Sequence, residues 1–308
     1  MNITQILSQE LSATAAQITA AIELLDDGAT VPFIARYRKE ATGGLDDTQL
    51  RQLAERLQYL RELEERKAVV LKSIEEQGKL SDDLRAQIEA ADNKTALEDL
   101  YLPYKPKRRT KAQIAREHGL QPLADVLLAE QPQDVEAAAQ GYLNENVPDT
   151  KAALDGARAI LMEQFAEDAE LIGTLRDKLW NEAEIHAQVV EGKETEGEKF
   201  SDYFDHREPV RAMPSHRALA VLRGRNEGVL NIALKYQPDD TPITQQSEYE
   251  QIIARRFKVS DDHKWLRDTV RLTWRAKIFL SLELEALNRL KEAADTDAIT
   301  VFARNLKD

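Results

Sequence analysis

The stretch DDTQLRQLAERLQYLRELEERKAVVLKSIEEQG, residues 46–78, decides the fold class. Its apolar series consists of Leu50, Leu53, Leu57, Leu60, Leu71 and Ile74. Spacings of three and four residues place such side chains on one face of an α-helix. Asp46-Asp47-Thr48 offers a helix start and Gly78 a helix end. The sequence therefore predicts one long amphipathic helix, densely charged and solvent-exposed on most faces from Arg61 to Lys67.

The same helical spacing recurs on both sides of this segment. We expect helices that begin at the capping residues Ser12, Ser81, Asn93 and Thr110, with ends at Asp27-Gly28 and His118-Gly119. Between them, Pro103 and Pro106 favour an extended, non-helical backbone. Further helices are expected over about 132–140, 154–165 and 172–183, and a last long helix from about Asp261. Its apolar positions, spaced four apart, are Leu266, Val270, Trp274, Ile278 and Leu282.

Composition agrees with a mainly α protein. Hydrophobic residues make up 42% of the 308 positions, charged residues 31% and aromatic residues only 6%, which suits amphipathic helices better than a β-sandwich. The residue pattern changes at Ile185. The segment IHAQVV predicts a short strand or the tail of a helix, the segment EGKETEGEK predicts a loop, and the segment VLNIALKY predicts a strand. We therefore expect an elongated multi-helix body with a small strand-containing segment around 185–236. The domains expected are 1–184 and 185–308, with an internal loop as the alternative to a boundary.

Several protein classes are disfavoured. The start MNITQILSQE lacks a basic stretch followed by an apolar core, and no run of about 18 apolar residues occurs. With no cysteine, disulfides, thiolate metal sites and cysteine nucleophiles are excluded. We expect a cytoplasmic protein that does not associate with membranes. The final segment DAITVFARNLKD resembles the opening of a helix without a stop signal, so we expect the natural chain to continue.

The net charge of −13 means that any contact with a polyanion must come from local basic patches. The strongest patch is YLPYKPKRRTKAQIAR, from Tyr101 to Arg116, which contains no acid. Its six cations are Lys105, Lys107, Arg108, Arg109, Lys111 and Arg116. An extended backbone would let these side chains reach phosphates beside Tyr101 and Tyr104. The alternative is a solvated loop that pairs with acidic helix surfaces at Glu62–Glu65 and Glu75–Glu76.

Two further segments combine cations with turns. In VPFIARYRKEATGG, Arg36, Arg38 and Lys39 flank Tyr37 before a Gly-Gly turn; the alternative is a connector whose Phe33 and Ile34 enter the core. In MPSHRALAVLRGRNEG, a helix is expected to start at Pro214-Ser215 and end at Gly224. Its cations are Arg211, Arg217, Arg223 and Arg225.

The segment KAQIAREHGLQPLADVLL has the spacing of a helix-turn-helix unit, with its turn at Gly119-Leu120. This spacing is common among helix pairs, so by itself it is weak support for DNA contact.

No catalytic pattern is present in the sequence. Gly192 and Gly197 imitate a phosphate-binding loop, but Glu198 stands where the lysine belongs and Phe200 where a hydroxyl belongs. The five histidines show no spacing typical of a metal pair. We expect no enzyme activity, no catalytic or metal-binding residues and no cofactor.

Three stretches together resemble the Tex family of bacterial transcription accessory proteins, in order and in separation. They are VPFIARYRKEATGGLDD (31–47), LEDLYLPYKPKRRTKAQIAREHGLQPLA (97–124) and MPSHRALAVLRGRNEGVL (213–230). The resemblance implies an elongated helical protein, related to a eukaryotic elongation factor, that binds nucleic acid and influences transcription. It also implies that full-length relatives continue into an RNase-H-like domain lacking the usual nuclease site, helix-hairpin-helix modules and an OB-fold domain that supplies the main RNA binding. The family offers no catalytic residues to carry over.

We therefore expect a scaffold fragment that contacts RNA or DNA weakly on its own. The expected contacts are Lys105, Lys107, Arg108, Arg109, Lys111, Arg116, Arg36 and Arg38. The alternative is a protein-interaction module that docks RNA polymerase or ribosome-associated proteins without touching nucleic acid. We expect a monomer in either case.

Overall fold

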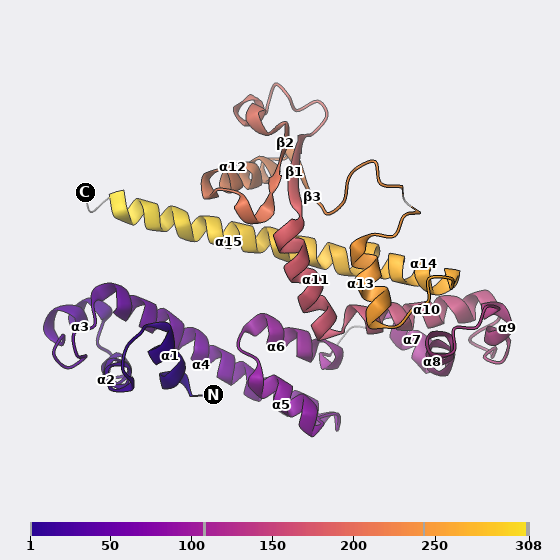
Figure 1. Cartoon of the computed structure of the whole chain (residues 1–308), viewed down its shortest axis with the longest axis horizontal. Coiled ribbons are helices and arrows are strands. Elements are labelled where there is room, and N and C mark those ends of the chain that lie inside the picture. The colour runs from indigo at the N-terminus through magenta and orange to yellow at the C-terminus, as the bar shows by residue number, and fades with distance from the viewer. Residues whose placement is uncertain (1, 107–108, 243, 306–308) are drawn as a thin grey trace. The chain divides into compact units, whose positions relative to one another are not determined.

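The computed structural model describes residues 2–106, 109–242 and 244–305 (Figure 1). Across these residues the chain forms fifteen α-helices and one small antiparallel sheet, so the predicted mainly α class with a short strand segment is confirmed. The chain divides into two compact units, unit 1 (Met1–Pro106) and unit 2 (Lys107–Asp308).

Unit 1 is entirely helical. Its elements are α1 (Ile3–Glu10), α2 (Ala15–Asp26), α3 (Val31–Tyr37), α4 (Asp47–Glu76), α5 (Asp82–Ala90), α6 (Lys94–Tyr101) and the 3₁₀ turn η1 (Leu102–Tyr104). The long helix predicted from residue 46 is confirmed as α4. The side chain of Asp46 caps it by accepting the backbone N–H of Gln49 at 2.7 Å, and Gly78 follows its end with φ +68°.

Helix α4 supports two apolar clusters. Helices α1, α2 and α3 pack around its first half (Figure 1). Leu7, Ile18 and Ile34 are fully buried there. Helices α5 and α6 cover its second half. Within the charged stretch 61–67, Leu63 and Lys67 are buried, and the Lys67 ammonium donates to the carbonyl of Glu89 at 2.8 Å. The stretch is thus buried on the face that meets α5 and α6, and Arg61, Glu62 and Glu65 on its other faces are exposed as expected.

Two local expectations for unit 1 are wrong, and the alternative of a connector over residues 31–37 also fails. Ser12 does not cap α2: it has φ +50°, and Thr14 caps the helix through a capping box with Gln17. Residues 31–37 form a helix and not a connector. The backbone is not extended over 102–104, because a proline in the first turn of a 3₁₀ helix sacrifices no internal hydrogen bond. Extended geometry begins at Lys105, with φ −64° and ψ 130°.

Unit 2 contains the remaining helices and the sheet. Its α-helices are α7 (Lys111–Glu117), α8 (Gln121–Ala129), α9 (Val135–Gln140), α10 (Thr150–Ala166), α11 (Ala169–Glu182), α12 (Ser215–Asn226), α13 (Glu248–Arg256), α14 (Lys264–Thr273) and α15 (Phe279–Asn305). Its strands are β1 (Glu184–Val189), β2 (Asp205–Pro209) and β3 (Leu230–Lys235). Short 3₁₀ turns η2 (Glu198–Tyr203) and η3 (Val210–Ala212) flank β2.

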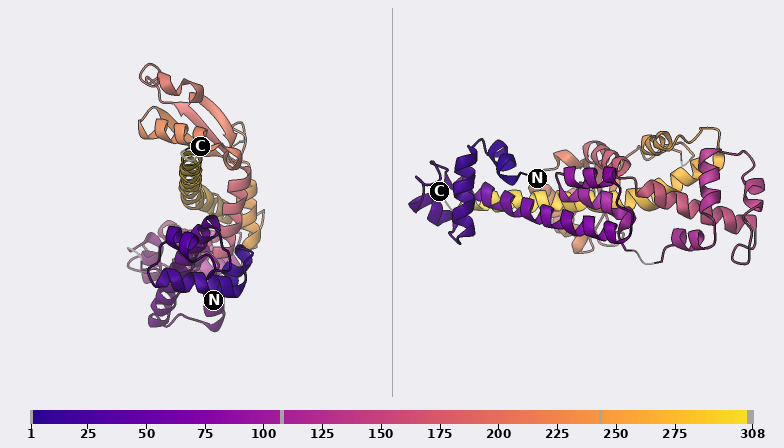
Figure 2. Two further views of the ribbon diagram at one scale, coloured as in Figure 1. Left: turned by 90° about the vertical axis from the view of Figure 1, so that its left-hand side faces the viewer. Right: turned by 90° about the horizontal axis from the view of Figure 1, so that it is seen from below.

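The strands form an antiparallel sheet in the order β2-β1-β3. Ile185 of β1 faces Glu208 of β2 and Leu234 of β3. Helix α12 packs on β3 and on α15 (Figure 2). Along the outer edge of β3, the N–H of Leu234 donates to Glu283 of α15 at 2.8 Å, so a side chain satisfies one donor of this edge.

Gly224 lies inside α12 and does not end it, contrary to expectation. A Cβ built at Gly224 would meet Leu230 Cδ1 at 2.5 Å, so the absence of a side chain lets the helix approach β3. The helix ends two residues later, and Gly228 with φ +72° follows.

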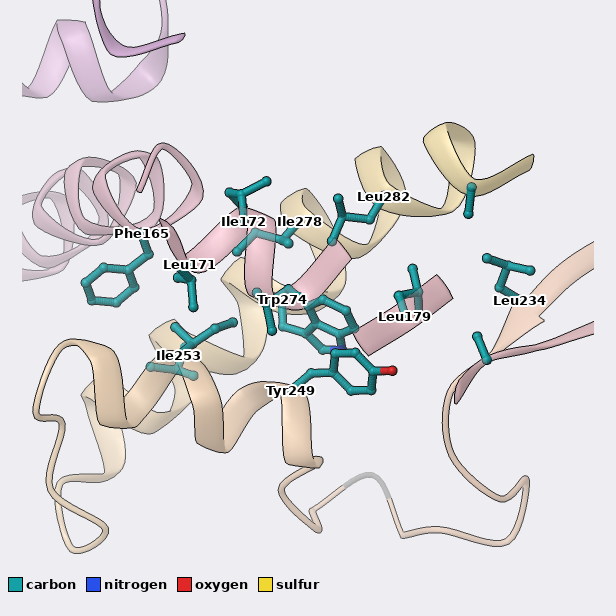
Figure 3. Packing of buried hydrophobic residues seen from close by; sticks show 14 of the residues in the cluster. Phe165, Leu171, Ile172, Leu179, Leu234, Tyr249, Ile253, Trp274, Ile278 and Leu282 are labelled. Carbon is teal, nitrogen blue, oxygen red and sulfur yellow. The ribbon is translucent and has the colours of Figure 1, made fainter. Parts of the chain in front are cut away.

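The core of unit 2 is continuous and crosses residues 184 and 185, where the sequence suggests a boundary. The division into 1–184 and 185–308 stays a prediction. At the centre of this core, Trp274 stacks on Tyr249 with ring centroids 4.5 Å apart (Figure 3).

A π-helical turn, η4 (Trp274–Ile278), joins α14 to α15. Apolar residues spaced four apart drift by about 40° per step around an α-helix, because each residue rotates by about 100°. The wider π turn absorbs part of this drift, and Leu266, Trp274 and Leu282 all stay buried.

Candidate nucleic-acid interface

Two of the four described cations between Tyr101 and Arg116 are engaged with the protein itself. Arg109 forms an ion pair with Glu117. Arg116 donates to Glu163 at 2.7 Å and to Gln121 at 2.9 Å. Because Glu163 is buried on α10, Arg116 fastens α7 to α10 and is not a free phosphate ligand. Lys107 and Arg108 lie outside the described residues.

Lys105 and Lys111 are exposed and form no ion pair within 4.0 Å among the described residues. The tyrosines beside them are less available than predicted. Tyr101 is buried, with its hydroxyl 3.0 Å from Ser73 Oγ and the Arg66 guanidinium over its ring. Tyr104 is half-buried. The described part of this stretch therefore offers two separate cations without an exposed aromatic ring beside them.

The second basic segment presents its side chains to solvent. Phe33 and Tyr37 lie one turn apart on α3, 43% and 70% exposed, with ring centroids 5.4 Å apart. Arg36, Arg38 and Lys39 are exposed, and within the described part of the chain no carboxylate lies within 4.0 Å of their charged groups. We call Phe33, Arg36, Tyr37, Arg38 and Lys39 the α3 surface.

Local sequence explains this exposure. Adjacent residues on a helix point about 100° apart, so the face of α3 that buries Ile34 leaves Phe33 to one side. Ile34 is fully buried and Phe33 is 43% exposed, so the alternative in which both enter the core is wrong. Phe33 and Lys39 join the expected Arg36 and Arg38 in one surface. The helical spacing of Phe33 and Tyr37 was the sequence signal that could have identified Phe33.

The loop that follows α3 is held in place by backbone and side-chain bonds. Gly44 N–H donates to Lys39 O at 2.9 Å, and Gly43 N–H to Glu40 O at 3.1 Å. The amide of Gln17, on α2, donates to Gly43 O at 2.8 Å. A Cβ at Gly43 would lie 2.8 Å from Gln17 Cγ, so glycine permits this approach as well as the φ of +61°.

An open hollow of about 710 Å³ lies beside this loop. Its lining residues are Arg36, Tyr37, Arg38, Lys39, Glu40, Ala41 and Gly44. Three cations against one carboxylate make the lining net positive in a chain of net charge −13. Cations beside an exposed aromatic ring are suited to a phosphate backbone with unstacked bases.

The third basic segment serves the structure of unit 2. Arg217 pairs with Glu208 at 2.7 Å, which links α12 to β2. Burial alone would raise the pKa of Glu208, but the hydrogen bonds from Arg217 and the His206 ring nitrogen 3.5 Å away outweigh it and lower the pKa below its ordinary value. Arg223 pairs with Glu227 at 3.0 Å and Arg211 donates to Asn181 at 2.8 Å, whereas Arg225 is exposed.

Helices α7 and α8, joined at Gly119 with φ +82°, form the helix pair that the sequence predicts. Helix α8 contains no lysine or arginine, and its exposed charged residue is Asp125. A recognition helix reads base edges mainly through cationic and amide side chains, so α8 is poorly equipped for this task. DNA contact by this helix pair stays a prediction.

No group of three or more histidine or acidic side chains that could hold a metal ion occurs in the part of the chain that the structure describes. Over the same residues, none of the helices is long and apolar enough to cross a membrane.

Comparison with known proteins gives matches along the chain. The Tex-like protein N-terminal domain model matches residues 1–75, and the Tex central region-like model matches residues 130–302. The chain is 97% identical to the transcriptional accessory protein Tex of Neisseria gonorrhoeae over its whole length, which covers 41% of that relative. It is 56% identical to protein YhgF of Escherichia coli, with 99% of this chain and 40% of the relative covered. It is 28% identical to S1 RNA-binding domain-containing protein 1 of Pongo abelii, with 99% and 32% covered.

Proposed function

The chain belongs to the Tex family, and we propose that it is a scaffold segment of a transcription accessory protein that contacts nucleic acid through the α3 surface. It spans about 40% of the length of the curated relatives it matches, so the proposal concerns this segment and not the whole protein. Transcription-related, nucleic-acid-associated function is supported at the level of the family.

The observation that carries the proposal is the set of unpaired cations beside exposed rings on α3. Two other arginines predicted to bind are held by carboxylates, Arg109 by Glu117 and Arg116 by Glu163. Arg36 and Arg38 have no such partner among the described residues, so binding a phosphate does not require breaking an internal ion pair. Each phosphate neutralised releases counterions, which makes the affinity salt-dependent.

The remaining parts of the proposal follow from chemistry and family. We propose no enzyme activity and no cofactor, a cytoplasmic location and a monomeric state. The helices serve here to position a surface. The sequence that imitates a phosphate-binding loop is incomplete, because Glu198 stands in place of the lysine and Phe200 in place of the hydroxyl residue.

A salt titration tests the proposal with two matched double variants. Arg36→Gln/Arg38→Gln and Lys105→Gln/Lys111→Gln each remove two exposed, unpaired cations from the full chain. We expect the first to weaken binding to RNA and to reduce the slope of log affinity against log salt by about 1.4, or about 0.7 for each lost phosphate contact. The second variant should change the RNA affinity and the salt slope less than the first. Equal effects of the two variants, or none, would refute contact through the α3 surface.

A protein-interaction function is the second candidate, and two exposed leucines favour it. Leu280 and Leu284 lie one turn apart on α15 and are 56% and 59% exposed. Exposed apolar patches commonly mark protein contacts. The partners expected for this function are RNA polymerase and ribosome-associated proteins. Capture of such a partner after nuclease treatment, lost in Leu280→Ser/Leu284→Ser, would favour this function over the first.

A further inference from the structure

Building on the proposed function, we infer that the α3 surface binds single-stranded nucleic acid by stacking an unpaired base on Tyr37. In this arrangement Arg36, Arg38 and Lys39 hold the phosphates on either side of that base.

The exposure of the two rings distinguishes single strands from duplexes. Phosphate contacts alone require only cations, as at Lys105 and Lys111. A ring that is 70% exposed next to a second, 43% exposed ring leaves apolar area in water that a base face would cover. In a duplex the base faces are already stacked on one another, so only single strands offer them.

The hollow gives the base a defined place. Tyr37 and Glu40 both line it, together with the three cations. Glu40 repels a phosphate but accepts a hydrogen bond from the exocyclic amine of a base. The lining therefore favours a base near Tyr37 and Glu40, with the backbone near Arg36 and Arg38.

The loop is already in a fixed form before any ligand arrives. Gly44 and Gly43 close it through backbone bonds, and Gln17 holds the carbonyl of Gly43. A surface that is ordered beforehand loses less conformational entropy on binding.

A structural role for the same cations is the competing explanation. Arg36 lies in the last turn of α3, where positive charge offsets the negative end of the helix dipole. This role predicts an effect on stability, whereas it predicts no effect of the Tyr37 ring on RNA affinity.

The test compares Tyr37→Ala with Tyr37→Phe in the full chain. The probes are a single-stranded oligouridine, an oligoadenosine and a blunt RNA duplex of the same length, with affinity followed by fluorescence anisotropy. Stacking contributes about 1–3 kcal/mol per base, so Tyr37→Ala should weaken single-strand binding by about 5- to 150-fold. Duplex binding should change little, and Tyr37→Phe should keep most of the affinity. Thermal unfolding of both variants checks that the fold is unchanged.

The outcomes separate this inference from the proposed function. Unchanged single-strand affinity in Tyr37→Ala, alongside weaker binding by Arg36→Gln/Arg38→Gln, overturns stacking but leaves nucleic-acid contact standing. No effect of either variant overturns both. Equal losses on single strands and duplexes would also overturn stacking, because a duplex offers no unpaired base to the ring. Displacement of the RNA by polyglutamate at the same charge concentration would overturn it too, because this result indicates recognition by charge alone.

Discussion

Gly224 decides how closely α12 packs against the sheet. A Cβ there would meet Leu230 Cδ1 at 2.5 Å, Leu230 Cγ at 2.8 Å and Phe200 Cδ1 at 3.3 Å. Glycine in a sequence usually suggests a helix end, and only the tertiary packing shows that this one lies within a helix. The ion pair of Arg116 with Glu163 is equally invisible in the sequence, because the two residues lie 47 positions apart.

Substituting Gly224 by alanine should destabilise the protein. The clash with Leu230 is expected to lower the free energy of unfolding by about 1–3 kcal/mol. Gly173, inside α11, has nothing within 4 Å of its ideal Cβ, so Gly173→Ala should raise the free energy of unfolding by about 0.4–1 kcal/mol. Urea denaturation measures both. Similar effects of the two substitutions would mean that α12 does not pack on β3 as described.

Asp239 should titrate abnormally. Hydrogen bonds from Arg207 on β2 and Lys235 on β3 lower its pKa from 3.8 to about 2. A pKa lowered by folding stabilises the native state above the unfolded value, and this contribution disappears as the pH falls from about 4 to about 2. The stability difference between the wild type and Asp239→Asn should therefore shrink over that range. A carboxyl ¹³C resonance that titrates near 3.8 would contradict the ion pairs.

At the scale of elements, local signals predicted most helices and tertiary effects explain the misses. Helix α4 was predictable because Asp46, its apolar series and Gly78 all lie within one segment. Strand β2 was missed because DHREP is polar throughout, and pairing with β1 is what makes it a strand. Helix α3 was missed because it is only seven residues long and contains Pro32 in its first turn. The α3 surface depends on that helix, so sequence indicated its cations but not its geometry.

Gln17 should matter for the loop after α3 and not only for α2. Gln17→Ala removes a capping box and the bond to Gly43 O, whereas Gln49→Ala removes the capping box of α4 alone. Each lost cap is expected to cost up to about 1 kcal/mol. Hydrogen exchange of residues 38–44 should accelerate in Gln17→Ala and stay unchanged in Gln49→Ala. Equal exchange in both variants would mean that Gln17 does not order the loop.

At the scale of the whole molecule, the chain consists of two units, each with its own buried apolar clusters. The sequence change at Ile185 marks the sheet, and the core of unit 2 continues through it. A change in composition along the sequence reports only the polarity of nearby residues. The division into compact units depends on the contacts that each segment makes in the folded chain. Residues far apart in the chain supply these contacts, so the division at residue 106 left no clear signal in the sequence.

The two units should fold independently. Residues 1–106 and 107–308, produced separately, are each long enough to bury a core. We expect each to unfold cooperatively, and their summed far-ultraviolet circular dichroism to equal that of the whole chain. If either piece lacks a cooperative transition, its core requires the other unit.

Photocross-linking tests the central claim most directly, because it locates contact without changing the protein. A single-stranded RNA that carries 4-thiouridine is irradiated with the full chain, and the adducts are mapped by mass spectrometry. We expect adducts within residues 33–39, at Tyr37 above all, that disappear when the RNA is a duplex. Adducts confined to residues 105–116, or to unit 2, would contradict it.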